Sequence, residues 1–246
     1  MARLSVNLNK IALLRNSRRT GIPDLRQFAR IAIDAGARGI TVHPRSDERH
    51  IRRSDVPALA SVLAPLRPRI ELNIEGYPDQ RLLEIVRDAR AEQCTLVPDA
   101  PDAFTSEKGW ELDAGQMRLA RPAIVALKAL GARVILFIDP DPGVLDRVIE
   151  AGADGVEIYT GGYAGAFRAG DPAALLDACA ETARQAEARH LVVNAGHDLN
   201  LRNLPPLMAR IPFLGEASIG HELTADALEM GFAAAVAAYA KALAAG

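Results

Sequence analysis

The stretch Gly39-Ile-Thr-Val-His43-Pro-Arg45-Ser-Asp-Glu-Arg49-His50 passes abruptly from a short apolar run into a cluster of polar and cationic side chains. The run is β-branched and follows Ala-Gly-Ala-Arg, which is typical of a helix that ends at a glycine and turns into a buried parallel strand. Imidazole exchanges protons near neutral pH, and guanidinium binds phosphate in bidentate fashion. The stretch therefore predicts a strand that feeds an active-site loop; an ordinary solvated charged loop is the alternative.

The same alternation of strand and helix continues along the whole chain. We expect strands at residues 4–10, 39–43, 70–75, 94–98, 133–139, 155–159, 191–195 and 216–221. We expect helices at residues 23–35, 55–66, 79–91, 113–130, 141–151, 172–189, 201–210 and 223–244, with long loops at 99–111 and 160–170. A helix-Gly-Ala-strand junction recurs three times, and the strand at 133–139 is apolar throughout, as in a sheet covered on both faces.

Eight alternating units with short connections in 246 residues predict a single (β/α)₈ barrel, the TIM barrel, with additional short helices and one domain over residues 1–246. No Gly-x-Gly-x-x-Gly follows a strand, so dinucleotide binding lacks its usual support. A hydrophobic content of 49% and a formal charge of -2 indicate a globular chain without a nucleic-acid or membrane surface as main partner.

Three further features bear on location. Cys94 and Cys179 lie far apart, without metal-ligand spacing, which favours reduced thiols and a cytoplasmic protein. The amino terminus lacks the apolar region of a signal peptide. The apolar run at 231–240 is too short to span a bilayer, so we expect no membrane insertion.

Most of the chemically suggestive side chains fall at or just beyond the carboxyl end of a predicted strand, which is the catalytic face of such barrels. They are Asn7, Asn9, Lys10, His43, Arg45, Glu75, Asp139, Glu157, His197 and His221. Any one histidine could simply make a structural hydrogen bond, but four of the five, His50 included, converge on this rim, whereas His190 lies at the opposite end.

Glu75 ends an apolar strand inside the predicted mouth. Desolvation there is expected to raise its pKa toward the range of a general base; an ion pair with a rim arginine is the alternative. Glu157 could equally be a structural charge of the barrel. The glycines of Thr160-Gly-Gly and Ile219-Gly220-His221 could approach a phosphate or simply form turns. No His-x-His lies on the first strand and no carboxylate trio is clustered, so we predict no metal site.

Several ordered motifs resemble the pyridoxine 5′-phosphate synthase (PdxJ) family over almost the whole chain. They are Val-Asn7, Leu-Arg15-Asn-Ser-Arg18, Ile-Thr-Val-His43-Pro-Arg45 through Arg49-His50-Ile, Asn-Ile-Glu75, Leu-Val-Pro98, Leu-Phe-Ile-Asp139, Glu157-Ile-Tyr-Thr-Gly161, Val-Asn-Ala-Gly-His197 and Ile-Gly220-His221. The resemblance implies condensation of 3-amino-2-oxopropyl phosphate with 1-deoxy-D-xylulose 5-phosphate to pyridoxine 5′-phosphate, phosphate and water, in vitamin B6 biosynthesis. It implies no redox cofactor and a homo-octamer.

The resemblance also implies roles for individual residues. His43 and Glu75 would accept protons, and His197 would donate one. Arg45, His50 and Thr105 would hold the deoxyxylulose phosphate, while Asn7, Arg18, Asp198, Gly220 and His221 would hold the aminoketone phosphate. The loop 99–111, with Thr105, would exclude water as a lid.

The chain departs from the common family pattern at two places. Asn7-Leu-Asn9-Lys10 stands where Asn-x-Asp-His is usual, and Asp198 stands where a glycine follows the histidine. We still expect Asn9 and Lys10 to contact substrate, with Lys10 as a cationic donor to the deoxyxylulose phosphate rather than a Schiff-base lysine.

Two other functions remain as alternatives. The first is a non-catalytic phosphate-binding barrel, which would have no need of His43, Glu75 and His197. The second is another phosphosugar-converting enzyme, such as an isomerase or an aldolase, but no lysine lies inside a predicted strand for an aldolase Schiff base.

Overall fold

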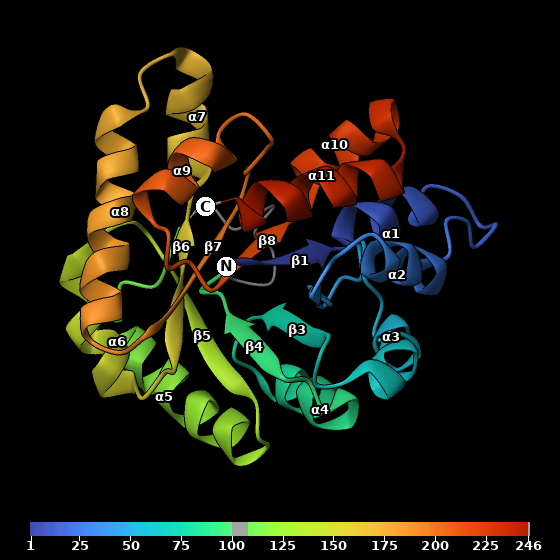
Figure 1. Cartoon of the computed structure of the whole chain (residues 1–246). Coiled ribbons are helices and arrows are strands. Elements are labelled where there is room, and N and C mark those ends of the chain that lie inside the picture. Colours follow the sequence, from blue (N-terminus) through green and yellow to red (C-terminus); the bar gives the residue numbers. More distant parts are fainter. Residues whose placement is uncertain (100–107, 246) are drawn as a thin grey trace.

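A computed structural model describes residues 1–99 and 108–245, in which parallel strands form a closed barrel in chain order (Figure 1). The strands are β1 (Arg3–Asn7), β2 (Gly39–Val42), β3 (Glu71–Gly76), β4 (Gln93–Leu96), β5 (Arg133–Ile138), β6 (Gly155–Tyr159), β7 (Val192–Gly196) and β8 (Glu216–Ile219). Pairing of Arg3 with Glu216 and of Ser5 with Gly39 joins β1 to both of its neighbours and closes the ring. The predicted (β/α)₈ barrel is confirmed.

Helices surround the barrel on all sides (Figure 1). They are α1 (Asn9–Asn16), α2 (Leu25–Asp34), α3 (Asp55–Leu63), α4 (Gln80–Ala89), α5 (Ala114–Ala129), α6 (Leu145–Ala151), α7 (Gly161–Ala169), α8 (Ala173–Ala188), α9 (Leu204–Arg210), α10 (His221–Met230) and α11 (Phe232–Ala244), with short 3₁₀ turns at Ala64–Leu66 and Pro142–Val144. The additional short helices expected from the sequence are therefore present. None of the helices in the described part of the chain has the length and apolarity needed to cross a membrane.

Three elements differ from the sequence predictions, each because a helix begins or ends where none was expected. The first strand was extended to residue 10, but β1 ends at Asn7 and α1 begins at Asn9, because Ile11, Ala12 and Arg15 form a buried helical face. The predicted loop at 160–170 is helix α7, whose buried Tyr163 donates a hydrogen bond of 2.7 Å to the Asn203 carbonyl. The predicted single carboxyl-terminal helix is divided into α10 and α11.

Glycines end several helices in the left-handed region. Gly36, Gly131 and Gly152, the three junction glycines singled out in the sequence, have φ values of +113°, +87° and +86°. This conformation is easily reached without a Cβ and lets the chain leave the helix toward the next strand. Gly231, with φ +83°, separates α10 from α11 in a related way, which explains why the alanine-rich segment is not one helix.

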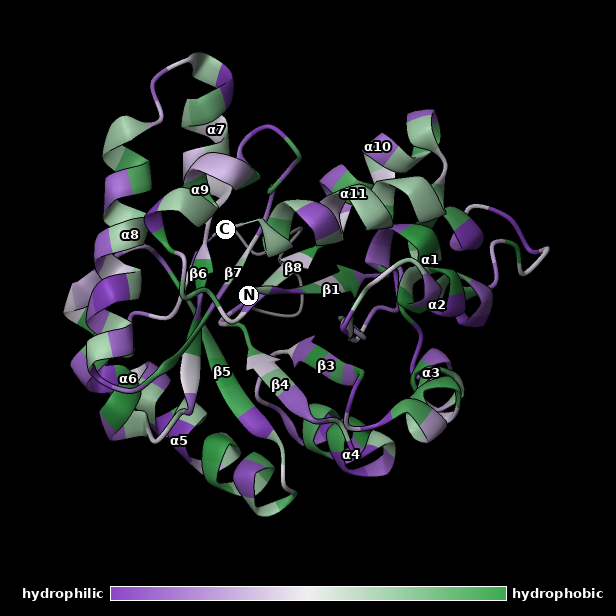
Figure 2. Ribbon diagram, in the orientation of Figure 1, coloured by the Kyte–Doolittle hydropathy of each residue, from purple (hydrophilic) through white to green (hydrophobic). Residues whose placement is uncertain are grey.

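The apolar core lies between the strands and the surrounding helices, whereas much of the barrel interior is polar. Outward-facing strand residues such as Val6, Ile40 and Ile74 are fully buried in that core, and Figure 2 shows hydrophobic residues on the strands and on parts of the helices around them. Inside the barrel, Ser5 and Thr41 hydroxyls lie 2.6 Å apart. Alternation along each strand thus separates a hydrophobic outer layer from a hydrogen-bonded interior.

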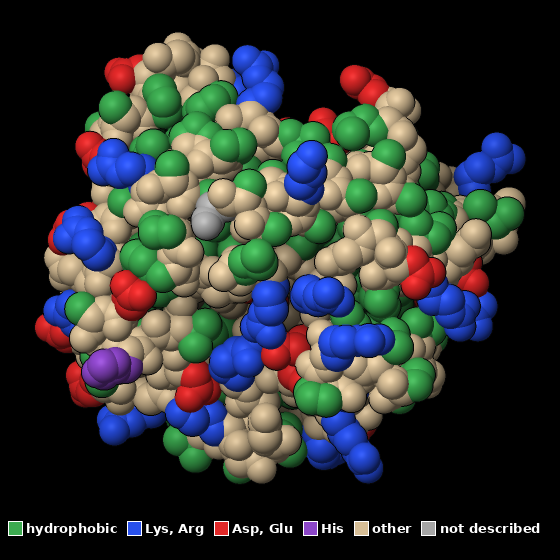
Figure 3. All heavy atoms as spheres, viewed as in Figure 1, with side chains coloured by type: hydrophobic (Ala, Val, Ile, Leu, Met, Phe, Trp, Pro, Cys, Tyr) green, Lys and Arg blue, Asp and Glu red, His purple; other side chains and the backbone are tan. Residues whose placement is uncertain are grey.

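Charged side chains close the amino-terminal end of the barrel. Glu71 accepts hydrogen bonds from Arg3, at 3.0 Å, and from Arg133, while Gln93 donates to buried Glu216 at 2.9 Å. Figure 3 shows basic side chains gathered near the centre of the face on which the N-terminus lies. This end of the barrel is therefore occupied by a structural ion-pair network, and the opposite end carries the candidate site.

Candidate active site

The carboxyl ends of β1, β2 and β3 bring together four predicted site residues. The Asn7 side-chain amide donates to Glu75 Oε2 at 3.3 Å, and the Asn9 backbone N–H donates to Asn7 Oδ1 at 3.0 Å. Asn9 Oδ1 in turn accepts the His43 backbone N–H at 2.9 Å. His43 Nδ1 lies 3.9 Å from Glu75 Oε2. The two asparagines therefore fix a carboxyl group and an imidazole beside each other.

Burial changes the proton affinity of both members of this pair. It raises the pKa of Glu75 to about 7, although the Asn7 hydrogen bond and the positive charge of Arg45 act in the opposite direction. The pKa of His43 is held well below its ordinary value, first by burial and then by the charges of Arg45, His50 and other cations. Near neutral pH, His43 is therefore neutral and Glu75 is divided between its two forms, as a pair of proton acceptors requires.

Glu157 lies deeper in the barrel and is also buried. Its pKa is raised well above the ordinary value by burial and by the neighbouring carboxyls of Glu75 and Glu216. A Cβ on Gly196 would lie 2.1 Å from Glu157 Oε1, so the adjacent strand needs a glycine at this position. Of the two interpretations made from the sequence, the structure favours a structural, protonated Glu157.

Arg45 and His50 form one corner of the mouth, called here the cationic corner because of the Arg45 guanidinium. Arg45 donates to Asp99 Oδ2 at 3.0 Å, and both side chains are buried. The alternative prediction, an ion pair between Glu75 and a rim arginine, is therefore not what the structure shows for Arg45. Sequence reasoning missed Asp99, whose only signal is an acidic residue directly after the predicted fourth strand. This pairing orients a buried guanidinium at the mouth.

His50 lies next to His43, with ring centroids 6.1 Å apart. Its Nδ1 accepts the Ile51 backbone N–H at 2.9 Å, so the neutral ring carries its proton on Nε2. Burial, together with the charges of Arg45, Arg49 and Lys10, lowers the pKa of His50 to about 4. His50 therefore offers a neutral N–H donor rather than a positive charge.

Three further predicted binding residues lie at the edge of this side or outside the described structure. Lys10 is exposed in the first turn of α1, and its positive charge contributes to the lowered pKa of His50. Arg18 is exposed in the turn that follows α1. Thr105, and with it most of the predicted lid, lies outside the described residues.

The β6–β8 side of the mouth carries His197 and Asp198. The His197 ring lies 5.2 Å from the Tyr159 ring and 5.7 Å from the Phe137 ring, between centroids. His197 and Asp198 both have left-handed backbones, with φ +83° and +56°. The Thr160 hydroxyl donates to the His197 carbonyl at 2.6 Å and stabilises this turn. Sequence reasoning missed both aromatic neighbours.

Gly220 and His221 complete this side. A Cβ on Gly220 would lie 3.0 Å from the Asn7 Cβ, so this glycine allows β8 to approach β1 closely. His221 is exposed and begins α10. Asp139, at the end of β5, is half-buried next to Gly109, where an added Cβ would meet the Asp139 backbone nitrogen. The structure thus places His221 and Asp139 at the rim of the mouth.

Among the residues that the structure describes, no three His, Cys, Asp or Glu side chains come together as a set of metal ligands. What does converge at the mouth is a carboxyl–imidazole pair, a buried guanidinium and a neutral imidazole donor. Such a barrel belongs to the class of enzymes that perform acid–base chemistry on anionic substrates. The family model described as pyridoxal phosphate biosynthesis protein PdxJ matches residues 4–245, and the chain belongs to this family.

Curated relatives cover nearly the whole chain. A protein of Allorhizobium ampelinum named pyridoxine 5′-phosphate synthase is 50% identical over 239 residues, which are 96% of this chain and 95% of the relative. A protein of the same name from Brucella anthropi is 48% identical, with 99% of each chain covered.

Solved structures of lower identity share the fold. Thiamine phosphate pyrophosphorylase from Pyrococcus furiosus has a TM-score of 0.60 at 11% identity, with 99% of this chain and 96% of that chain covered. Phosphoribosyl anthranilate isomerase from Thermotoga maritima has a TM-score of 0.60 at 12% identity, with both chains fully covered. These similarities support the barrel and nothing finer.

Proposed function

We propose that the chain condenses 3-amino-2-oxopropyl phosphate with 1-deoxy-D-xylulose 5-phosphate to pyridoxine 5′-phosphate, with release of phosphate and water. The observation that carries the proposal is the buried Glu75–His43 pair, held by Asn7 and Asn9, in a chain of the PdxJ family. The relatives that match this chain over nearly their full length are named pyridoxine 5′-phosphate synthase.

The chemistry requires several proton transfers, because the substrate amine must form an imine with a ketone and water must then leave. Neutral His43 and partly ionised Glu75 act as proton acceptors on the β1–β3 side. His197, held against Tyr159 on the opposite side, is the proton donor to the leaving oxygen.

The two phosphates are assigned to different parts of the mouth. Arg45, His50 and Thr105 hold the deoxyxylulose phosphate, with Lys10 as an additional cationic donor beside Asn9. The buried guanidinium and the Nε2–H of His50 support this assignment, since both present donors at one corner.

The aminoketone phosphate is assigned to the side where β8 meets β1. Asn7, Arg18, Asp198, Gly220 and His221 hold it there. The close approach of Gly220 to Asn7, followed by the first turn of α10, supports this assignment because backbone N–H groups at a helix start favour anions.

We further propose that the protein works in the cytoplasm as a homo-octamer on small phosphorylated substrates. Light scattering of the purified protein tests the assembly, because an octamer would show a mass near eight times the 26.3 kDa of one chain. A monomer or dimer at assay concentration would contradict it.

The activity is tested by incubating the purified protein with both substrates and measuring pyridoxine 5′-phosphate and inorganic phosphate together. We expect equal amounts of the two products, and none when either substrate is omitted. Binding without turnover would favour the non-catalytic barrel, and conversion of one substrate alone would favour an isomerase or aldolase. Glu75→Gln is the matched inactive control.

A further inference from the structure

The loop that carries His50 has no regular secondary structure from residue 43 to residue 54. Glu48 within it adopts a left-handed backbone with φ +52°. Backbone carbonyls in such a segment have no ladder partners and need other donors. The position of the His50 ring therefore depends on whatever holds this backbone.

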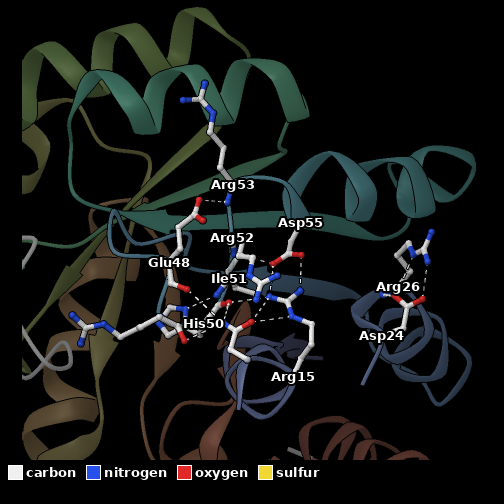
Figure 4. Close-up of polar contacts among 11 residues, drawn as sticks. Arg15, Asp24, Arg26, Glu48, His50, Ile51, Arg52, Arg53 and Asp55 are labelled. Atoms are coloured by element: carbon white, nitrogen blue, oxygen red, sulfur yellow. Dashed lines mark hydrogen bonds and ion pairs between the residues drawn. The ribbon is translucent and has the colours of Figure 1, made fainter. Parts of the chain in front are cut away.

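Two side chains from the last turn of α1 supply those donors. Asn16 Nδ2 lies 2.8 Å from the His50 carbonyl oxygen, 3.1 Å from that of Arg49 and 3.4 Å from that of Glu48. Arg15 Nη2 donates to the same His50 carbonyl at 3.1 Å. Figure 4 shows the Arg15 side chain directed toward Asp55 and the His50 segment.

Arg15 is itself held in a fixed orientation. Its Nη1 and Nη2 donate to the two oxygens of Asp55 at 2.6 and 2.9 Å, and its Nε donates to Asn16 Oδ1 at 3.1 Å. Asp55 Oδ2 also accepts the Arg52 backbone N–H at 2.8 Å. A bidentate carboxylate pair, 93% removed from solvent on the Arg15 side, thus connects α1 to the end of the loop.

The Arg15–Asp55 pair borders a cavity that also contains a second arginine–carboxylate pair. A cavity of about 230 Å³ lies against Arg15 and Asp55 and is also lined by Asp24 and Arg26. Arg26 makes an exposed pair with Asp24 at the start of α2, away from the loop (Figure 4). The chain therefore offers a matched control: an arginine on the same cavity, paired with a carboxylate, that does not anchor the His50 backbone.

We propose that Arg15, aligned by Asp55 and assisted by Asn16, is a positioning residue for His50, an inference that rests on the proposed role of His50 in holding the deoxyxylulose phosphate. His50 Nδ1 accepts the Ile51 backbone N–H, so the direction of the Nε2–H donor follows the backbone of residues 50 and 51. Arg15 and Asn16 hold that backbone. Loss of this anchor misdirects the donor without removing it.

The test compares Arg15→Lys and Asn16→Ala with the control Arg26→Lys. Lysine keeps the charge but lacks the planar fork, so binding of 1-deoxy-D-xylulose 5-phosphate, measured by calorimetry, should weaken about tenfold. The KM for the same substrate should rise in proportion, while kcat and the KM for the aminoketone phosphate change less than about threefold. Arg26→Lys should change neither affinity by more than about twofold.

A double-mutant cycle separates positioning from a general structural role. In a His50→Ala background, Arg15→Lys should weaken binding by less than about threefold further, because the donor that it orients is gone. A full additional tenfold loss would overturn the inference, as would unchanged binding in both single variants. If circular dichroism shows that Arg15→Lys does not fold, the same double-mutant cycle is measured with Asn16→Ala, since Asn16 is only half-buried.

These outcomes are distinct from failure of the proposed function. A wild-type protein that binds the deoxyxylulose phosphate but yields no pyridoxine 5′-phosphate contradicts the synthase proposal. In that case the calorimetric cycle still tests whether Arg15 positions His50. A wild-type protein that makes the product, with Arg15→Lys binding as tightly as wild type, contradicts only the positioning role.

Discussion

The two sides of the barrel mouth are held by different means. On the β1–β3 side, hydrogen bonds of 2.9 to 3.3 Å connect Asn9, Asn7, Glu75 and the backbone of His43 in a largely buried cluster. On the β6–β8 side, His197 lies against aromatic rings on a left-handed turn, and His221 is exposed.

This difference separates two ways of preparing a site for chemistry. On the first side, burial lowers the pKa of His43 and raises that of Glu75. Near neutral pH, His43 is therefore neutral and Glu75 is partly protonated. The second side is defined by backbone shape, with Thr160 and Asn203 donating to the carbonyls of His197 and Asp198. We therefore expect substitutions in the buried Glu75–His43 pair to affect catalysis more strongly than a substitution at the partly exposed Asp198 of the second side.

The largest expected effect comes from the carboxyl group of the buried pair. Glu75→Gln keeps the size and can still accept the Asn7 hydrogen bond, but it cannot accept a proton. Turnover should fall about 10²- to 10⁴-fold in the product assay, with an unchanged circular dichroism spectrum. In the His43→Asn variant, turnover should fall by a factor of about 10² or more, because asparagine cannot accept a proton either. Near-normal turnover in both variants would remove the basis for distinguishing this side.

A smaller and selective effect is expected at the cationic corner. Arg45→Lys retains the charge facing Asp99 but loses the planar fork, so the KM for 1-deoxy-D-xylulose 5-phosphate should rise about 10- to 100-fold. The KM for the aminoketone phosphate should remain within about threefold. Equal increases for both substrates would contradict the assignment of the two phosphates to different sides.

Burial of Glu75 also predicts a pH-dependent stability. Because its folded pKa is about 7 and its ordinary value is 4.5, the unfolded chain releases a proton between these pH values that the folded chain keeps. This group's contribution to the free energy of unfolding therefore falls as pH rises from about 4.5 to about 7.

Glu75→Gln has no such proton to lose. Relative to wild type, the variant should gain on the order of 3 kcal/mol in free energy of unfolding between pH 4 and pH 8, measured by urea denaturation. A difference between the two proteins that does not change with pH would show that the folded structure leaves the Glu75 pKa at its ordinary value.

The smallest effect is expected at Asp198, on the β6–β8 side. Asp198 has φ +56°, which glycine adopts without the usual cost, and its carboxylate lies 3.9 Å from the mostly exposed Arg168. Asp198→Gly should therefore change the free energy of unfolding by less than about 1 kcal/mol and kcat/KM by less than about fivefold. A loss comparable to that of Glu75→Gln would show that the two sides are not as different as their contacts indicate.

Much of this comparison could be predicted from the sequence. The apolar runs followed by Asn7, His43, Glu75 and His197 place these side chains at strand ends, because period-two alternation and glycine-ended helices are local signals. The burial of Glu75 in the structure raises its pKa in the direction expected from the sequence.

Two helices and one long-range contact could not be predicted from the sequence. Helix α1 was missed because its polar start continues the alternation of β1, and α7 was missed because it begins with two glycines. The partnership of Arg45 with Asp99 joins residues 54 positions apart, and no local pattern encodes it. Whether Asn9, Lys10 and Asp198 contact substrate stays a prediction.

The proton affinity of Glu75 is the property on which the proposed chemistry depends most. It can be measured directly by NMR titration of protein labelled with ¹³C in the glutamate carboxyl groups, with the Glu75 signal identified by its absence in Glu75→Gln. A titration midpoint of about 7 is predicted. A midpoint near the ordinary value of 4.5 would contradict the account, because Glu75 would then be a fully ionised carboxylate at neutral pH and the two sides of the mouth would not differ in the way described.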